Sequence, residues 1–329
     1  MFLDYSYILS FGALINFLLG ARGYGKSYGA KKLVIKDFLK DGSQFIYLRR
    51  RDSELKEVTF SLFNDINLHN EFEKPVIYDS DGFLYDGKQC GYCMALSKAA
   101  DYKSSSYPEV KTIIFDEVLT DKKPGYLLNE PERLLDFMET IFRMRDNVRI
   151  FMLSNSISLN NPYVIKWDLY VPKGKNYLFK DDVLFMLLES KEYSAAKART
   201  RLGRLYNALD KDFAAYAVEN AFLFDDQSFI EKKSGQCNYK FTFIWKGKKY
   251  GVWHNYKTGL VYISTDINTT YSLELALSGD DHRENLMLLR GKKGNIFDSV
   301  VFESYKMGCL RFESKKIRNE TLDIFKRMV

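Results

Sequence analysis

The chain has 329 residues, of which 46% are apolar and 28% are charged, so its composition excludes a disordered chain and its length leaves room for about two domains. The formal net charge of +6 is unevenly placed, because residues 229–329 carry 18 Lys and Arg against 11 Asp and Glu. This basic C-terminal third indicates either a polyanionic partner or an ordinary lysine-rich surface.

The apolar N-terminus lacks the features of a targeting segment. Residues 1–19 contain no basic n-region and no small-residue cleavage site, and their uncharged run is too short to span a bilayer. The four cysteines fit a reducing compartment, and their spacing does not complete a zinc site. We therefore expect a cytoplasmic protein without a membrane partner.

A phosphate-binding motif follows this apolar run. Residues 14–19 predict a buried strand, residues 28–40 predict an amphipathic helix, and the sequence between them fits G-x-x-x-x-G-K-[ST]. The glycines let backbone N–H groups point at phosphate oxygens, and the helix adds its positive end. We expect Lys26 to reach the β- and γ-phosphates of ATP and Ser27 to ligate Mg²⁺. The predicted nucleotide-binding loop is Gly20, Ala21, Arg22, Gly23, Tyr24, Gly25, Lys26 and Ser27.

The next part of the chain alternates apolar runs with polar stretches. An apolar strand at 44–48 ends in Arg49-Arg50-Arg51, whose side chains could face phosphates, a neighbouring subunit or solvent. The elements that follow are predicted to be an amphipathic helix over 52–75, strands at 76–78 and 83–85 that form a hairpin, a strand at 90–96, and a polar loop over 97–108.

A second motif occurs at 112–117, where a β-branched and aromatic run ends in two acids. This is the Walker B pattern. The strand places Asp116 at its carboxyl end, where it can hold Mg²⁺ opposite Ser27. Glu117 can orient or deprotonate the attacking water, and a carboxylate at this position is typical of ASCE-type NTPases. The sequence therefore predicts ATP hydrolysis.

Further strands and helices predict a mostly parallel sheet with helices on both faces. A helix over 131–146 ends in Arg143-Met144-Arg145, and a strand at 149–153 ends at Asn155, a candidate sensor of the γ-phosphate. Two more strands are predicted near 168–171 and 183–188. The ligand should lie at the carboxyl ends of the strands, where the motifs converge.

The pattern changes after residue 190. Residues 191–224 are Ala-rich, basic and predicted to be helical, whereas strands at 239–245, 250–255 and 260–264 predict an antiparallel sheet. Helices are predicted at 283–289, 296–307 and 316–328. This order resembles a ribonuclease-H-like α+β fold, but the first strand has no acid, so we expect no nuclease activity. The predicted domains are a P-loop ATPase domain (1–190), a helical linker or lid (191–228) and a nucleic-acid-binding domain (229–329).

With these motifs in place, the chain resembles the genome-packaging ATPase of small φ29-type tailed phages, nearly from end to end. The resemblance rests on INFLLGARGYGKSYGA (15–30), QFIYLRR (44–50), TIIFDE (112–117), IFRMR (141–145), LSNSISLNNPY (153–163), TRLGRLYNA (200–208), FIEKKS (229–234), GVW (251–253) and CLRFESKKIRN (309–319).

The resemblance implies a motor that translocates double-stranded DNA into a preformed procapsid. The family's members form a ring, reported as five subunits, that docks on a structural RNA and the portal. Such a protein acts in the host cytoplasm, transiently on the procapsid, and is not in the mature virion. By position, Arg143 matches an arginine finger that reaches a neighbour's ATP, and Lys103 matches a lysine implicated in signalling between subunits. The C-terminal domain matches a vestigial nuclease-like domain that contacts the RNA.

Two other functions stay open from the residues alone. An ATP-switched nucleic-acid-binding module without translocation agrees with the basic tail, and it would bind RNA with a steep salt dependence. A P-loop small-molecule kinase agrees with the arginine-rich stretch 197–204, which could form a lid over an acceptor. A kinase would transfer phosphate to that acceptor and would not respond to DNA.

Overall fold

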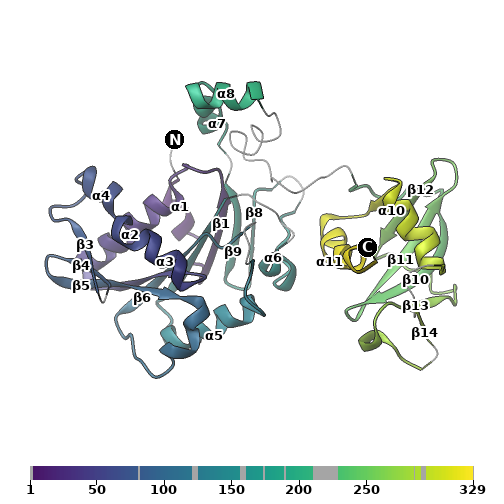
Figure 1. Ribbon diagram of the computed structural model, residues 1–329, viewed down its shortest axis with the longest axis horizontal. Helices are drawn as coiled ribbons and strands as arrows, with labels where there is room; N and C mark the ends of the chain where they lie inside the picture. The colour runs from purple at the N-terminus through teal and green to yellow at the C-terminus, as the bar shows by residue number, and fades with distance from the viewer. Residues whose placement is uncertain are drawn as a thin grey trace. The chain divides into compact units, whose positions relative to one another are not determined.

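A computed structural model gives the structure of the protein over residues 3–80, 82–120, 125–155, 161–172, 175–188, 190–209, 229–284, 286–289 and 294–328. The chain divides into two compact units, Met1–Asp225 and Asp226–Val329 (Figure 1). The described part of the expected linker, 191–209, belongs to the first unit. Residues 210–228 lie outside the described residues, so the division into three domains stays a prediction.

The described residues of the first unit form a nine-stranded sheet in the order β3-β4-β5-β2-β6-β7-β1-β9-β8. Its strands are β1 (Ile15–Gly20), β2 (Gln44–Arg49), β3 (Val76–Asp79), β4 (Gly82–Tyr85), β5 (Lys88–Ala95), β6 (Val110–Asp116), β7 (Arg149–Ser154), β8 (Tyr177–Lys180) and β9 (Val183–Leu188). From β5 to β9 the neighbours are parallel. The antiparallel strands β4 and β3 extend one edge, and the antiparallel strand β8 extends the other. The predicted α/β fold is confirmed.

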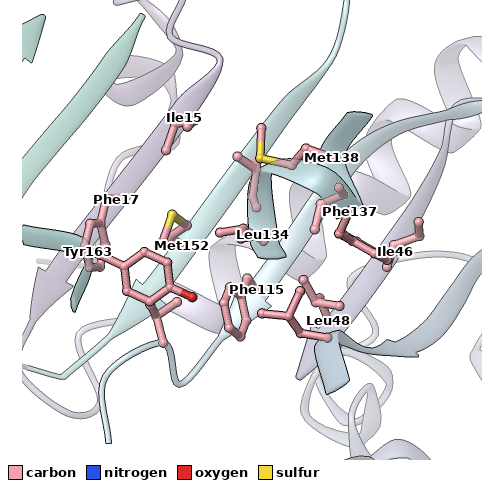
Figure 2. Close-up of a cluster of buried hydrophobic side chains, with 14 of the residues drawn as sticks. Ile15, Phe17, Ile46, Leu48, Phe115, Leu134, Phe137, Met138, Met152 and Tyr163 are labelled. Atoms are coloured by element: carbon pink, nitrogen blue, oxygen red, sulfur yellow. The ribbon is translucent and has the colours of Figure 1, made fainter. Parts of the chain in front are cut away.

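Helices cover both faces of this sheet, as its apolar strands require. The described helices of this unit are α1 (Tyr5–Leu9), α2 (Lys26–Asp41), α3 (Asp52–Val58), α4 (Asn64–Leu68), α5 (Glu130–Phe142), α6 (Pro162–Lys166), α7 (Lys191–Ala198) and α8 (Arg201–Leu209), and α7 and α8 contribute no residue to the two cores beside the sheet. Alternate residues of β1 enter different cores, because side chains alternate across a strand. Phe17 packs in the core with Phe137 of α5 (Figure 2), whereas Leu18 packs in the core with Val34 of α2.

Several predicted elements of the first unit differ from the structure. The helix expected over 52–75 is α3, a 3₁₀ turn at Thr59–Ser61 and α4, and the chain leaves α4 through Asn70, whose φ is 49°. Part of the loop expected over 97–108 is a 3₁₀ helix, Leu96–Tyr102. The helix expected to reach residue 146 ends at Phe142. These differences reflect local backbone turns that hydrophobic periodicity does not encode.

The strand predicted at 168–171 is wrong. These residues close the end of α6: Asp168 has φ 55°, and the N–H of Leu169 donates to the carbonyl of Val164 at 3.0 Å. This is the bond of a helix C-terminal cap, in which a left-handed residue is followed by a buried apolar one. Leu169 is buried as part of that cap and not as part of a strand. The next strand of the sheet is β8.

The second unit is an α+β domain with a six-stranded sheet among its described residues, in the order β14-β13-β10-β11-β12-β15. Its elements are β10 (Asn238–Trp245), β11 (Lys248–Asn255), β12 (Leu260–Ser264), β13 (Glu274–Ala276), β14 (Met287–Leu288), a π-helical turn (Asp298–Phe302), α10 (Glu303–Lys306), β15 (Leu310–Phe312) and α11 (Lys315–Met328). The three antiparallel strands are confirmed, and helices pack on one face through a core that includes Phe241, Phe302 and Phe325.

The helix predicted at 283–289 is wrong, because its apolar residues pair with the sheet instead. Met287 and Leu288 of β14 lie parallel to Leu275 and Ala276 of β13. The helices predicted at 296–307 and 316–328 are present. No helix in the described part of the chain is both long and apolar enough to cross a bilayer.

Candidate nucleotide-binding site

The loop between β1 and α2 has the backbone of a phosphate-binding turn. Gly23 and Gly25 both have φ 86°, a left-handed conformation that favours glycine. A Cβ at Gly23 would also lie only 2.6 Å from the hydroxyl of Tyr193. Because α2 begins at Lys26, its first N–H groups and the positive end of its dipole face the cleft that the loop borders. The sequence predicted this local structure in full.

Lys26 extends into the cleft from the first turn of α2. Its ammonium donates to the carbonyls of Gly20 and Ala21 at 2.8 Å each, and to Oδ1 of Asn155 at 3.3 Å. Only 7% of the residue is exposed. Burial lowers the pKa of Lys26 to about 8, although Asp116 opposes this shift. The predicted sensor Asn155, at the end of β7, is therefore next to the phosphate-binding lysine.

Ser27 and Asp116 meet at the carboxyl end of the sheet. The hydroxyl of Ser27 donates to Oδ2 of Asp116 at 2.9 Å, and the hydroxyl of Tyr47 donates to the same oxygen at 3.3 Å. Hydroxyl and carboxylate oxygens are ligands that Mg²⁺ prefers, and Mg²⁺ usually keeps water and phosphate oxygens as its other ligands. The pair therefore fits the predicted metal site.

Glu117 lies directly after β6, with φ 55°. Its carboxylate Oε2 is 2.8 Å from Nη1 of Arg49, the last residue of β2. The Glu117 side chain is 60% exposed, whereas that of Arg49 is 7% exposed, so a buried cation holds an acid that water can reach. Sequence reasoning left the partner of Arg49 open, and the parallel pairing of β2 with β6 supplies it.

Arg50 fixes the chain that follows Glu117. Its guanidinium makes two hydrogen bonds to the carboxylate of Glu130, at 2.7 and 2.9 Å, and donates to the carbonyl of Val118. Arg50 and Glu130 are both fully buried, and Tyr163 also donates to Glu130 at 2.8 Å. This buried pair anchors the segment that begins at Glu117, the candidate base.

These elements surround a cleft of ≈ 1030 Å³. Its lining contains most of the predicted site residues together with a group that the sequence did not indicate. The predicted residues are Arg22, Gly23, Gly25, Lys26, Ser27, Asp116, Glu117 and Asn155, and the additional ones are Leu3, Tyr28, Gly29, Lys32, Asp65, His69, Glu71 and Ser154. Gly20, Ala21 and Tyr24 belong to the loop but do not line the cleft.

Arg143 and Lys103 do not line the cleft of their own chain. Arg143 follows α5 with φ 51° and ψ −128°, is exposed, and donates to the carbonyl of Ser105 at 3.1 Å. Lys103 is half-exposed and forms an ion pair with Asp136 at 2.9 Å. The neighbouring Arg145 instead donates to several carbonyls of its own unit. The roles of Arg143 and Lys103 stay predictions.

Helix α7, in the predicted lid, contacts the phosphate-binding loop. The hydroxyl of Tyr193 and the ammonium of Lys197 donate to the carbonyl of Arg22, at 3.0 and 2.9 Å. The rings of Tyr193 and Tyr24 also lie edge to face, 5.3 Å apart. Burial and the nearby Arg22 lower the pKa of Lys197. A movement of the loop at Arg22 would therefore change the contacts that hold α7.

Comparison with known sequences identifies the family. A sequence profile described as Podovirus DNA encapsidation protein (Gp16) matches residues 1–329. The chain belongs to this family. The Gp16-family chain is 36% identical over 323 residues to the DNA packaging protein of Bacillus phage phi29, and the match covers 98% of this chain and 96% of that protein.

Solved structures support the same assignment. The Gp16-family chain matches a chain of the bacteriophage Phi-29 viral genome packaging motor assembly with a TM-score of 0.80 and 35% identity, covering 100% of this chain and 99% of that one. It also matches the crystal structure of the N-terminal domain of the DNA packaging ATPase from bacteriophage phi29, with a TM-score of 0.54 and 38% identity, over 58% of this chain and 98% of that one. The resemblance seen in the sequence is confirmed.

Proposed function

We propose that this protein is an ATP-hydrolysing motor that translocates double-stranded viral DNA into a preformed procapsid. The observation that carries the proposal is the meeting of Lys26, Ser27 and Asp116 in one cleft of a chain from a DNA encapsidation family. The phi29 relatives are named for DNA packaging and for a packaging motor assembly. Each of these three residues has a chemical role in this proposal.

In the proposed reaction the triphosphate lies along the phosphate-binding loop. Lys26 exchanges its hydrogen bonds to the loop carbonyls for bonds to the β- and γ-phosphates. Asn155, next to Lys26, binds an oxygen of the γ-phosphate. Ser27 and Asp116 would hold Mg²⁺, which neutralises phosphate charge when it is bound. These contacts orient the phosphoryl group for in-line attack by water.

Glu117 is the proposed general base, because it is the exposed carboxylate next to Asp116 in the cleft. It accepts a proton from the attacking water as the oxygen bonds to the γ-phosphorus and the bond to the β-phosphate oxygen breaks. The ion pair of Glu117 with Arg49 stabilises the charged carboxylate but also holds it away from the position of the attacking water. A productive site therefore requires Glu117 to turn from Arg49 towards the water.

The proposal includes a ring of subunits, with five as the expected number, docked on the portal and on a structural RNA in the host cytoplasm. Arg143 supports it, because its exposed position at the end of α5 suits a finger that completes a neighbour's site. The basic surface of residues 229–329 suits an RNA partner, and Lys103 would carry signals between subunits.

The deciding experiment measures ATP turnover by the purified protein with and without double-stranded DNA, and repeats both measurements with Glu117→Gln. We expect turnover that rises with DNA, and a loss of about 10²–10⁴-fold in the variant, which removes the general base but keeps the size of the side chain. ATP binding should persist. Unchanged turnover in Glu117→Gln would show that Glu117 is not the general base.

If turnover is negligible in both conditions, the same measurement is repeated with procapsids that carry their RNA. Turnover that appears only then would support a motor that assembles on the procapsid. RNA binding that depends steeply on salt, without any DNA-stimulated turnover even on procapsids, would instead support an ATP-operated switch.

A further inference from the structure

One half of the cleft has no part in the proposed phosphate chemistry. Its lining residues come from the N-terminal segment, from the first two turns of α2, and from α4 and the loop after it. They are Leu3, Tyr28, Lys32, Asp65, His69 and Glu71. Because Tyr28 directly follows Ser27, this half of the cleft begins where the phosphate-binding half ends. A ligand held by its phosphates at Lys26 can continue into it.

The walls of this second half are aromatic. The rings of Tyr28 and His69 lie 5.9 Å apart at an interplanar angle of 82°, so they present an edge-to-face pair. Both residues line the cleft, Tyr28 is partly exposed, and His69 is exposed. The side chain of Leu3 adds an apolar group. A flat aromatic ligand can stack on such a surface, as bases do on aromatic side chains.

The polar groups in this half are mainly acceptors. The carboxylate of Glu71 is held by the hydroxyl of Tyr28 and by the ammonium of Lys32. Nδ1 of His69 is 2.7 Å from the carbonyl of Asp65, and a carbonyl only accepts, so Nδ1 carries the proton and Nε2 of the neutral ring is an acceptor. The carboxylates of Glu71 and Asp65 are paired with the ammonium groups of Lys32 and Lys31, so this end of the cleft has no unpaired cation among these residues to bind more phosphate. Ribose hydroxyls and amino groups of a base are the donors that suit it.

We propose that this half of the cleft binds the nucleoside part of the nucleotide, with the base against Tyr28 and His69 and with donor groups of the nucleoside bonded to Glu71. The inference rests on the proposed function, because it needs the phosphates to be held at Lys26. It assigns the recognition of the nucleotide to residues that the sequence motifs do not include. Tyr28 and His69 are binding residues in this proposal, and they take no part in the transfer of the phosphoryl group.

The test compares two ligands that share their phosphates and differ in the nucleoside. Dissociation constants for ATP and for inorganic tripolyphosphate are measured by calorimetry in Mg²⁺ on the full chain, its Tyr28→Ala variant and its His69→Ala variant. Tyr28→Ala should weaken ATP binding about 5-fold to 100-fold, the range for losing one stacked base, and leave tripolyphosphate within about twofold. Tyr28→Phe keeps the ring and should lose much less affinity than Tyr28→Ala.

His69→Ala should show the same selective loss, and because His69 is exposed its removal should leave the fold intact. Tyr256→Ala is the matched control, since Tyr256 is 61% exposed in the other unit and should alter neither dissociation constant. Equal weakening of both ligands in Tyr28→Ala and His69→Ala would overturn the proposal, and so would two unchanged ATP affinities.

Lys26→Ala separates this inference from the proposed function. It should weaken ATP and tripolyphosphate together, because both ligands need the phosphate site. Wild-type affinity for both ligands in Lys26→Ala would overturn the phosphate site and with it the proposed hydrolysis. The ratio of the two affinities in Tyr28→Ala would still decide whether the nucleoside half exists.

Discussion

Lys26 is a cation placed where little water reaches it. Its burial lowers its pKa to about 8, Asp116 opposes the shift, and the like charges of Lys197 and Arg22 add to it. The ammonium is satisfied by two loop carbonyls, which a triphosphate would replace. The negative charge of a bound triphosphate should raise the pKa again, because an opposite charge nearby favours the charged form.

This shift predicts a pH dependence of ATP binding. Above about pH 8 the free protein has lost the Lys26 proton, so binding must take one up, and ATP affinity should fall by roughly tenfold per pH unit as pH rises. Calorimetry in buffers of different ionisation enthalpy should detect about one proton taken up at pH 9.5 and far less at pH 7.5. Lys197→Met should retain the uptake. An ATP affinity that stays the same between pH 7.5 and pH 9.5 would contradict the assignment of Lys26 as the group that binds the phosphates.

The arginines at 49–51 have partners that their own sequence position does not identify. The sequence places three like cations in a row at the end of a strand. In the structure Arg49 pairs with Glu117, Arg50 pairs with Glu130, and Arg51 donates to the carbonyl of Gly125 at 2.8 Å. The partners of Arg49 and Arg50 lie 68 and 80 positions away in the sequence, and only the order of strands in the sheet brings them near. Motif residues could be predicted because each motif is a local sequence pattern at the carboxyl end of a strand, and these ends meet at one edge of a parallel sheet.

At the scale of elements, the same distinction separates correct predictions from wrong ones. The strands that lead to Asp116 and Asn155 are continuous apolar runs, and the helix that carries Lys26 follows a phosphate-binding motif, so these elements were predicted with nearly their observed bounds. Short apolar runs failed, because Leu169 is buried by a helix cap and Leu288 lies partly exposed in a short edge strand. The nucleoside half of the cleft was missed because its residues come from three separated elements.

Helix α5 begins with a residue that joins three elements. Glu130 lies in its first turn, where negative charge suits the helix dipole, and it binds Arg50 after β2 and Tyr163 of α6. Glu130→Ala would leave the Arg50 guanidinium buried without its partner. The variant should therefore lose about 3–5 kcal/mol of the free energy of unfolding of the first unit. Urea unfolding followed by far-UV circular dichroism measures the loss.

Glu132→Ala is the matched control for this prediction, because Glu132 lies in the same turn. Its partner is Lys166, and the side chains are 47% and 59% exposed. An exposed pair of this kind contributes about 0–1 kcal/mol. Equal losses in the two variants would mean that the burial of the Arg50–Glu130 pair has no energetic weight, and would contradict the anchoring role of Arg50.

At the scale of the whole molecule, one chain holds most of the candidate nucleotide-binding site. Most of the phosphate-binding loop, the candidate metal ligands and the candidate base line the cleft, but the proposed finger Arg143 does not. Arg143 is exposed, and the backbone at this position has φ 51° and ψ −128°, an unusual conformation for a residue with a side chain. Backbone strain of this kind is found where function requires a particular presentation of a side chain. In the proposed ring, the Arg143 side chain would reach the nucleotide site of a second copy of the chain.

A ring with shared sites predicts complementation between two inactive variants. Arg143→Ala keeps its own cleft but offers no finger, whereas Lys26→Ala lacks a phosphate site but offers Arg143. Each alone should lose about 10³–10⁵ in turnover. An equal mixture assembled on procapsids should recover on the order of a quarter of wild-type turnover if subunits are incorporated at random. About a quarter of the interfaces then pair the intact cleft of an Arg143→Ala subunit with the intact finger of a Lys26→Ala subunit. Mixing Arg143→Ala with the double variant Lys26→Ala/Arg143→Ala supplies no finger and should recover nothing. Recovery in neither mixture would place the action of Arg143 within its own subunit or outside the reaction.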